Sequence, residues 1–130
     1  ETLDSNNSWK CDKCKRNVNP EKKIVFWNLS DVLIIQIKRY DSNLRKIDRH
    51  IEFPTLLKMG KFCMNYNEQN MNYKLCSMSI QSGSLNGGHY YSYVLNLNGN
   101  WYNYNDTNVS KMEKDNVITQ SAYCLFYQLK

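Results

Sequence analysis

GGHYYSYVLNLNGNWYNYND, residues Gly87–Asp106, is the most informative segment of this 130-residue chain. It contains two runs rich in tyrosine, valine and tryptophan, His89–Leu97 and Asn100–Tyr104, and these residue types favour β-strands. Between the runs lies Asn98-Gly99, a dipeptide that commonly forms the tight turn of a hairpin. The segment therefore predicts an antiparallel β-hairpin.

Strand-like segments lie on both sides of this hairpin. They are Lys22–Leu29, Val32–Tyr40, Arg45–Phe53, Tyr73–Ile80 and Ala122–Leu129. The nearly continuous apolar run Val32–Ile37 is typical of a strand covered on both faces. We expect a polar loop at residues 64–72, a glycine-rich loop at Gln81–Gly88, and one short helical turn within Val109–Ile118. The prediction is one α+β domain, mainly antiparallel β-sheet.

The composition is that of an ordinary globular protein. Its hydrophobic fraction of 42% and charged fraction of 22% argue against disorder. No apolar run approaches the roughly 20 residues that span a bilayer. Residues 1–8 are polar and acidic, whereas a secretory signal is basic and then apolar. We therefore expect no membrane partner and no secretory signal.

Charge is distributed unevenly along the chain. The 17 basic and 12 acidic residues give a net charge of +5. Residues 1–62 hold 13 basic and 8 acidic residues, whereas residues 63–130 hold four of each. The densest basic group lies at positions 10, 13, 15 and 16, around two cysteines, and is too small for a phosphate track. We interpret it as a solvated metal-loop surface and expect no nucleic-acid partner.

The five cysteines are an odd number, whereas a disulfide framework uses cysteines in pairs. Cys11 and Cys14 form a C-x-x-C pair, which supplies two of the four ligands of a tetrahedral zinc site. Cys63, Cys76 and Cys124 lie in apolar or aromatic surroundings, where a free thiol packs as a small hydrophobic group. Free cysteines indicate a reducing compartment, so we expect a cytoplasmic or nuclear location.

His89 is the candidate for chemistry. It follows Gly87-Gly88, and Asn105 and Asp106 come sixteen residues after it, beyond the predicted hairpin turn. Pairing of the two strands would bring His89 and Asn105 to the same end of the hairpin, as a base beside an orienting amide. A lone histidine is more often structural, so spacing alone leaves the structural and catalytic interpretations at about even weight.

Several segments together resemble the ubiquitin-specific proteases, papain-like cysteine peptidases that remove ubiquitin. G-G-H-Y-Y-S-Y (Gly87–Tyr93) and W-Y-N-Y-N-D (Trp101–Asp106) resemble the His box of that family. Five further segments agree in order: E-T-L (Glu1–Leu3), W-K-C-D-K-C (Trp9–Cys14), V-L-I-I-Q-I-K-R-Y (Val32–Tyr40), I-E-F-P (Ile51–Pro54) and A-Y-C-L-F-Y (Ala122–Tyr127). The resemblance covers nearly the whole chain. It implies that residues 1–23 form the second half of a zinc ribbon in the fingers, and residues 24–130 the palm.

The resemblance also implies roles for individual residues. His89 matches the catalytic base, Asn105 the residue that orients the imidazole, and Asp106 an adjacent acid that supports catalysis in some members. The channel for the Gly-Gly tail of ubiquitin would be lined by Gly87, Gly88, Tyr90, Gln81, Ser82 and Gly83. Gln81 stands where the family usually has a histidine, and we expect this to alter tail contacts or loop setting rather than abolish activity. Cys11 and Cys14 match half of the zinc site, so zinc needs a second cysteine pair upstream.

The Cys box of the family, which holds the nucleophile and forms the oxyanion hole, does not occur in the sequence. Cys63, Cys76 and Cys124 lack the glycine-rich, helix-opening context that activates a thiol. We therefore expect the C-terminal part of one catalytic domain, inactive alone, with the Cys box upstream. Two alternatives remain: an inactive ubiquitin-binding or scaffold module of the same fold, and a zinc-dependent nucleic-acid-binding domain, which leaves the His box unexplained.

Overall fold

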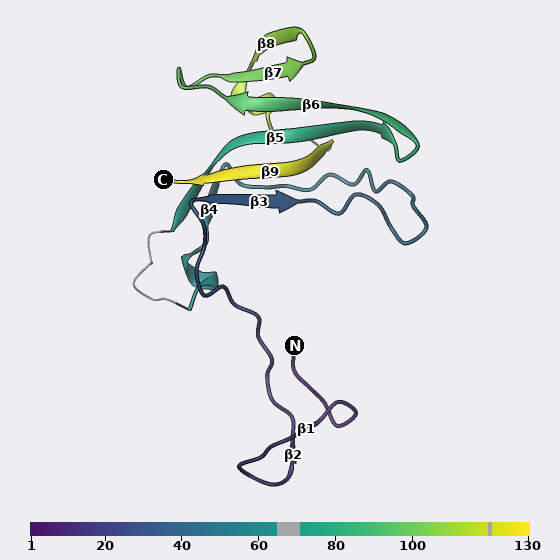
Figure 1. Ribbon diagram of the computed structural model, residues 1–130, viewed down its shortest axis with the longest axis vertical. Coiled ribbons are helices and arrows are strands. Elements are labelled where there is room, and N and C mark those ends of the chain that lie inside the picture. The colour runs from purple at the N-terminus through teal and green to yellow at the C-terminus, as the bar shows by residue number, and fades with distance from the viewer. Residues whose placement is uncertain (65–70, 120) are drawn as a thin grey trace.

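The computed structural model describes residues 1–64, 71–119 and 121–130, and its regular structure is almost entirely antiparallel sheet. A seven-stranded sheet has the order β3-β9-β5-β6-β7-β8, with β4 also pairing with β5 (Figure 1). The strands are β3 Val32–Gln36, β4 Leu56–Lys58, β5 Asn72–Ser84, β6 Gly87–Leu95, β7 Trp101–Asn105, β8 Asn108–Met112 and β9 Ala122–Leu129. Helix in the described part is limited to the 3-10 turns η1 (Gly60–Phe62) and η3 (Lys114–Asn116). The predicted class, mainly antiparallel β, is confirmed.

A second, smaller hairpin lies near the N-terminus. Its strands are β1 (Trp9–Lys10) and β2 (Asn17–Val18), which pair with each other. Figure 1 shows this hairpin well apart from the large sheet, at the end of an extended segment. None of the helices in the described ranges is long and apolar enough to cross a membrane.

The core is built on β5, the longest strand, which pairs with β4, β6 and β9. Fully buried side chains come mainly from β5 and β9, with Val117 from the segment after η3; the largest are Tyr73, Leu75, Met78, Ile80, Val117 and Tyr127. Hydroxyl groups of the buried tyrosines donate to backbone carbonyls, as in the 2.6 Å hydrogen bond from Tyr127 to Pro54. This packing fixes β5, and β5 in turn aligns β6, which begins at the candidate site.

Four predicted elements are confirmed. Tyr73–Ile80 lies within β5, and Ala122–Leu129 coincides with β9. The hairpin of β6 and β7 closes around Asn98-Gly99, where Gly99 has a φ of 79° that favours glycine. The predicted helical turn is η3, although β8 occupies the first part of that segment.

Two predicted strands are wrong. Lys22–Leu29 forms a single bridge, at Phe26, because no strand lies beside the rest of it. Arg45–Phe53 forms no strand, because the backbone carbonyls of residues 47 and 49 accept hydrogen bonds from the guanidinium of Arg39. Arg39 is 2% exposed, and apart from an isolated bridge between Lys46 and Tyr40 this segment wraps the buried cation.

Three further predictions need correction. Val32–Tyr40 is a strand only over β3, and β3 is an edge strand whose Ile34 is 64% exposed, not a covered one. Gln81–Gly88 is not an open loop, because β5 continues to Ser84 and β6 resumes at Gly87. Of the predicted polar loop at residues 64–72, positions 65–70 lie outside the described residues, and Asn72 already belongs to β5.

The buried phenol of Tyr127 makes stability sensitive to alkaline pH. Burial raises the pKa of Tyr127 to about 12, above the ordinary value of 10.0. The contribution of Tyr127 to the free energy of unfolding is therefore fully present below pH 10. It is lost as the pH rises toward 12, because the phenol of the unfolded chain releases its proton at a lower pH than that of the folded chain. Urea unfolding should show that the wild-type chain is less stable at pH 11 than at pH 9, and that this loss of stability is smaller in Tyr127→Phe. An equal drop in both proteins would contradict this assignment.

Candidate active site

His89 and Asn105 meet because of the register of β6 and β7. Ser92 of β6 pairs with Tyr104 of β7, so the next positions along the two antiparallel strands place Asn105 opposite Tyr91. Asn105 therefore lies diagonally adjacent to His89, on the same face of the sheet. Nε2 of His89 lies 2.6 Å from Oδ1 of Asn105. An amide oxygen only accepts hydrogen bonds, so Nε2 carries a proton, and the lone pair of the neutral imidazole is on Nδ1. Asn105 thus selects the tautomer whose Nδ1 is free to accept a proton.

Asp106 is adjacent to this pair but contacts it less closely. It lies in the tight turn between β7 and β8 and has a φ of 51°, a left-handed conformation that aspartate tolerates. Its Oδ2 is 3.8 Å from Nε2 of His89, and its side chain is 75% exposed. The carboxylate is therefore too far for a hydrogen bond to the imidazole.

One ring face of His89 is supported by Tyr91. The two rings stack with centroids 6.0 Å apart and an angle of 23° between their planes. Tyr91 in turn contacts Tyr93, which is next but one along β6. The His89 side chain remains 46% exposed. The imidazole is thus oriented by Asn105 and Tyr91 while staying open to an incoming group.

The hairpin of β5 and β6 leaves no room for side chains at two of its glycines. Gly83 pairs with Gly88, immediately before His89. A Cβ at Gly88 would lie 2.5 Å from the carbonyl oxygen of Ser82, and Gly83 has a φ of 87°. Gly87, by contrast, would meet nothing within 4 Å. The two strands need Gly83 and Gly88 for their own close approach, whereas Gly87 faces open space.

Gln81 and Tyr90 lie on the other face of the hairpin from His89. They pair with each other, and adjacent residues of a strand point to opposite faces. Gln81 is 2% exposed, and its Nε2 donates to the carbonyl oxygen of Ser82 at 3.2 Å. Tyr90 is 54% exposed and packs edge-to-face on Tyr123. Gln81 therefore fixes the hairpin backbone, and Tyr90 does not share the face of the imidazole.

Lys46 also fixes this hairpin, and no local sequence pattern indicates this contact because it spans 35 residues. Its ammonium group donates to the carbonyl oxygens of Gln81, at 3.2 Å, and Gly83, at 2.9 Å. Asp48 lies 3.6 Å from the same nitrogen, and the Lys46 side chain is only 16% exposed. A partly buried cation thus holds the strand end that leads to His89.

Removing this cation should loosen the hairpin. Lys46→Met keeps the apolar stem and deletes both hydrogen bonds, and we expect a loss of about 1–3 kcal/mol of stability. Amide hydrogen exchange should accelerate at residues 81–88 more than in the core of β9. Lys38→Met, at an exposed position, is the matched control. Unchanged exchange in the Lys46 variant would show that the hairpin does not depend on this contact.

Cys11 and Cys14, the two cysteines expected to form half of a zinc site, are held close together by a tight turn. The backbone N–H of Cys14 points at Sγ of Cys11, 3.4 Å away, and Lys15 has a φ of 57° that turns the chain back. Backbone N–H groups, first of Cys14 and then of Lys13, lower the pKa of the Cys11 thiol and so favour the thiolate. The described ranges contain no group of three or more metal-ligating side chains. Any metal here needs ligands beyond these residues.

Cys63, Cys76 and Cys124 have the environments of structural thiols. Cys63 is buried and donates to the carbonyl oxygen of Met59, and Cys76 donates to that of Phe126. Burial raises the pKa of the Cys124 thiol, which keeps it protonated. A nucleophilic cysteine needs the opposite shift. These environments agree with the expectation that the nucleophile is none of the three.

Comparison with known proteins gives matches over nearly the whole chain. The family model for ubiquitin carboxyl-terminal hydrolase matches residues 2–127. Ubiquitin carboxyl-terminal hydrolase 4 of Pongo abelii is 38% identical over 133 residues, covering 98% of this chain and 14% of that protein. Ubiquitin carboxyl-terminal hydrolase 15 of Homo sapiens is 35% identical, with the same coverage of 98% and 14%. The chain thus spans about one seventh of the curated relatives that it matches.

Solved structures give the same result. In the SAGA DUB module with Ubp8, Sgf11, Sus1 and Sgf73 bound to monoubiquitin, the matched chain has a TM-score of 0.84 and 31% identity. The match covers 100% of this chain and 30% of that one. The same module bound to ubiquitin aldehyde gives a TM-score of 0.81 at 30% identity, covering 100% and 31% of the two chains.

Proposed function

Because this chain belongs to the ubiquitin carboxyl-terminal hydrolase family, we propose that it supplies the base side of a deubiquitinating thiol protease. The observation that carries the proposal is the 2.6 Å contact between Nε2 of His89 and Oδ1 of Asn105. It leaves Nδ1 as the nitrogen available to a thiol. In this assignment His89 is the base, Asn105 orients it, and Asp106 adds charge stabilisation.

The reaction follows from that assignment. Nδ1 of His89 takes the proton from a cysteine thiol, and the thiolate attacks the carbonyl carbon of the terminal glycine of ubiquitin. The resulting imidazolium gives its proton to the leaving amine as the amide bond breaks. Water then attacks the thioester with His89 again as base, which releases ubiquitin and restores the thiol. The carboxylate of Asp106, 3.8 Å from Nε2, is the nearest acidic group to the ring during these steps.

We propose that the tail of ubiquitin passes along the start of β6. Gly87 offers open space beside the hairpin, and Gly83 and Gly88 keep the hairpin flat enough for a backbone to approach. Gln81 and Ser82 hold this surface through the hairpin backbone, and Tyr90 bounds the opposite face. Ubiquitin as substrate is supported by related Ubp8 structures that carry monoubiquitin or ubiquitin aldehyde.

The nucleophile is proposed to come from an upstream Cys-box half of the same catalytic domain. The structure exposes several large apolar side chains on β3, in the segment before it and in η1; Ile24, Phe26, Trp27, Ile34 and Phe62 are each more than 40% exposed. Large apolar side chains exposed in such number are in keeping with a partner that covers them. The proposed assembly has residues 1–23 in the fingers and residues 24–130 in the palm. A cytoplasmic or nuclear location is part of the proposal, in keeping with five free cysteines.

Zinc is the proposed structural metal of the fingers, with Cys11 and Cys14 as two of four thiolate ligands. Cobalt(II) added to the complete protein should give the visible absorption bands of a tetrahedral thiolate site, and Cys14→Ser should weaken them. Removal of zinc should lower stability without changing the chemistry at His89. The hairpin of β1 and β2, which contains Cys11 and Cys14, lies apart from β6, the strand that carries His89 (Figure 1). A complete protein that purifies without metal and gains no bands would contradict this assignment.

Hydrolysis of a fluorogenic ubiquitin substrate tests the proposed function. The chain, its upstream half and the two together would be assayed in parallel. We expect turnover only from the pair. A folded pair that binds ubiquitin without turnover would instead indicate the inactive binding module. Turnover by the chain alone would place the nucleophile among Cys63, Cys76 and Cys124.

A further inference from the structure

Positive charge in the second half of the chain converges on one cavity. From residue 63 onward the sequence has four basic residues, and all four line a cavity of about 430 Å³. They are Lys74 on β5, Lys111 on β8, Lys114 in η3 and Lys130 after β9. Four separate segments therefore deliver their cations to the same place. We call this cavity the lysine pocket.

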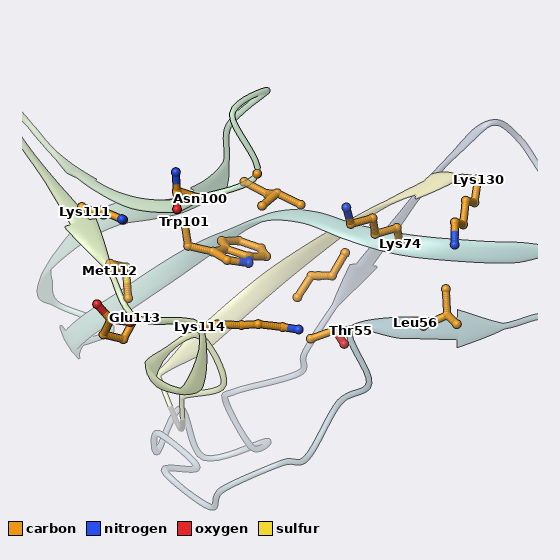
Figure 2. Close-up of a pocket in the computed structure, with 13 residues that line it drawn as sticks. Thr55, Leu56, Lys74, Asn100, Trp101, Lys111, Met112, Glu113, Lys114 and Lys130 are labelled. Carbon is orange, nitrogen blue, oxygen red and sulfur yellow. The ribbon is translucent and has the colours of Figure 1, made fainter.

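The lysine pocket also has an apolar lining. Leu56, Leu75, Leu95, Trp101 and Met112 contribute to it, and Trp101 is 5% exposed. Figure 2 shows Lys111 on one side of the Trp101 indole and Lys74 and Lys130 on the other. In the same view the long side chain of Lys114 extends toward Thr55. The cavity thus combines an apolar floor with cations on several sides.

This pocket is separate from the candidate active site. It contacts β6 at Leu95, whereas His89 lies six residues earlier on the same strand. At the rise of an extended strand, six residues correspond to about 20 Å. A ligand in the lysine pocket would therefore not occupy the site around His89.

The charge in the pocket is largely uncompensated. The ion pairs found in the described residues are Lys23–Glu21, Lys46–Asp48 and His89–Asp106, and none of them includes a pocket lysine. Glu113 is the one acidic side chain among the described lining residues. Clustered like charges raise the local potential and attract a ligand of opposite charge. The pocket is therefore electrostatically suited to an anion.

We propose that the lysine pocket binds an acidic peptide segment that carries an apolar side chain between its carboxylates. A compact anion such as phosphate would reach lysines on one side only, and would leave the leucine and methionine surfaces without a partner. Single-stranded nucleic acid binds by stacking bases on exposed aromatic rings, whereas the indole of Trp101 is almost fully buried. An extended peptide satisfies both features, because its carboxylates meet separated lysines while its apolar side chain enters the cavity.

Fluorescence anisotropy with a defined peptide tests this proposal. The probe is a labelled nine-residue peptide with a central leucine flanked by four aspartates on each side, added to the full chain. We expect saturable binding that weakens about tenfold in Lys74→Gln/Lys111→Gln, from the loss of two charge contacts. The exposed pair Lys23→Gln/Lys38→Gln removes the same charge elsewhere and should leave binding unchanged. Thermal melts would establish that both variants are folded.

Two further binding measurements distinguish an acidic peptide with an apolar side chain from other anions. Replacing the central leucine of the probe with serine should weaken binding, because the apolar floor then has no partner. Inorganic phosphate and a labelled nine-nucleotide single strand should bind more weakly than the peptide. Three results would each overturn the proposal. They are an equal loss of binding in both lysine variants, unchanged binding when the central leucine is replaced, and tighter binding of the oligonucleotide than of the peptide. The outcome does not depend on whether the assembled enzyme cleaves ubiquitin.

Discussion

Replacing His89 with alanine is expected to lower kcat of the assembled enzyme about 10³-fold or more, because the thiol loses its base. Ubiquitin binding should change little, since the His89 side chain is 46% exposed. The measurement is steady-state hydrolysis of the fluorogenic substrate, with ubiquitin affinity determined separately. A variant that keeps a tenth or more of wild-type kcat would rule out His89 as the base.

Variants of the two neighbours provide graded controls for this result. Asn105→Ala removes the acceptor that lies 2.6 Å from Nε2, so kcat should fall about 10–10²-fold through loss of the correct tautomer. Asp106→Asn should cost less, because its carboxylate is 3.8 Å away and 75% exposed. An Asp106 effect larger than that of Asn105 would reverse the roles assigned to them.

Gly88→Ala is the second change with a large expected effect. Its Cβ would lie 2.5 Å from the carbonyl oxygen of Ser82, so the hairpin must spread immediately before His89. We expect a stability loss of about 1–3 kcal/mol and a fall in kcat of about 10²-fold from misplacement of the imidazole. Urea unfolding and steady-state kinetics would measure the two effects.

Gly87→Ala is the matched control, because a Cβ there meets nothing within 4 Å. Its stability should stay within about 0.5 kcal/mol of wild type. If the tail of ubiquitin passes over Gly87, turnover should nevertheless fall, since the new methyl group narrows the channel. Wild-type turnover in Gly87→Ala would move the channel elsewhere, whereas wild-type stability in Gly88→Ala would contradict the close approach of β5 and β6.

The hairpin of β6 and β7, and the proximity of His89 to Asn105, were predictable because both depend on residues that are close in the sequence. Asn98-Gly99 fixes the turn of β6 and β7, and the register that follows brings His89 to Asn105. Alternation along Tyr73–Ile80 likewise marked part of β5. Short-range turn chemistry and side-chain period are therefore sufficient for this part of the site.

The features that the sequence did not predict depend on distant contacts. Lys46 meets Gln81 across 35 residues, and Arg39 reaches Ala122 across 83. Arg45–Phe53 alternates as a strand would, yet its carbonyls bind the Arg39 guanidinium instead of a neighbouring strand. The apolar run at β3 indicated a covered strand, whereas β3 is an exposed edge in these residues. Pattern alone does not say which element, or which other part of a protein, will cover a surface.

In the proposed enzyme, His89 of this chain activates a thiol held by the upstream half. The most direct test is the rate at which that thiol reacts with ubiquitin carrying a C-terminal electrophile, measured with the upstream half alone and after the chain is added. The wild-type chain should accelerate the reaction about 10²-fold or more, and the His89→Ala chain should bind the upstream half without accelerating it. Equal acceleration by both chains, or none by either within a formed complex, would contradict the account.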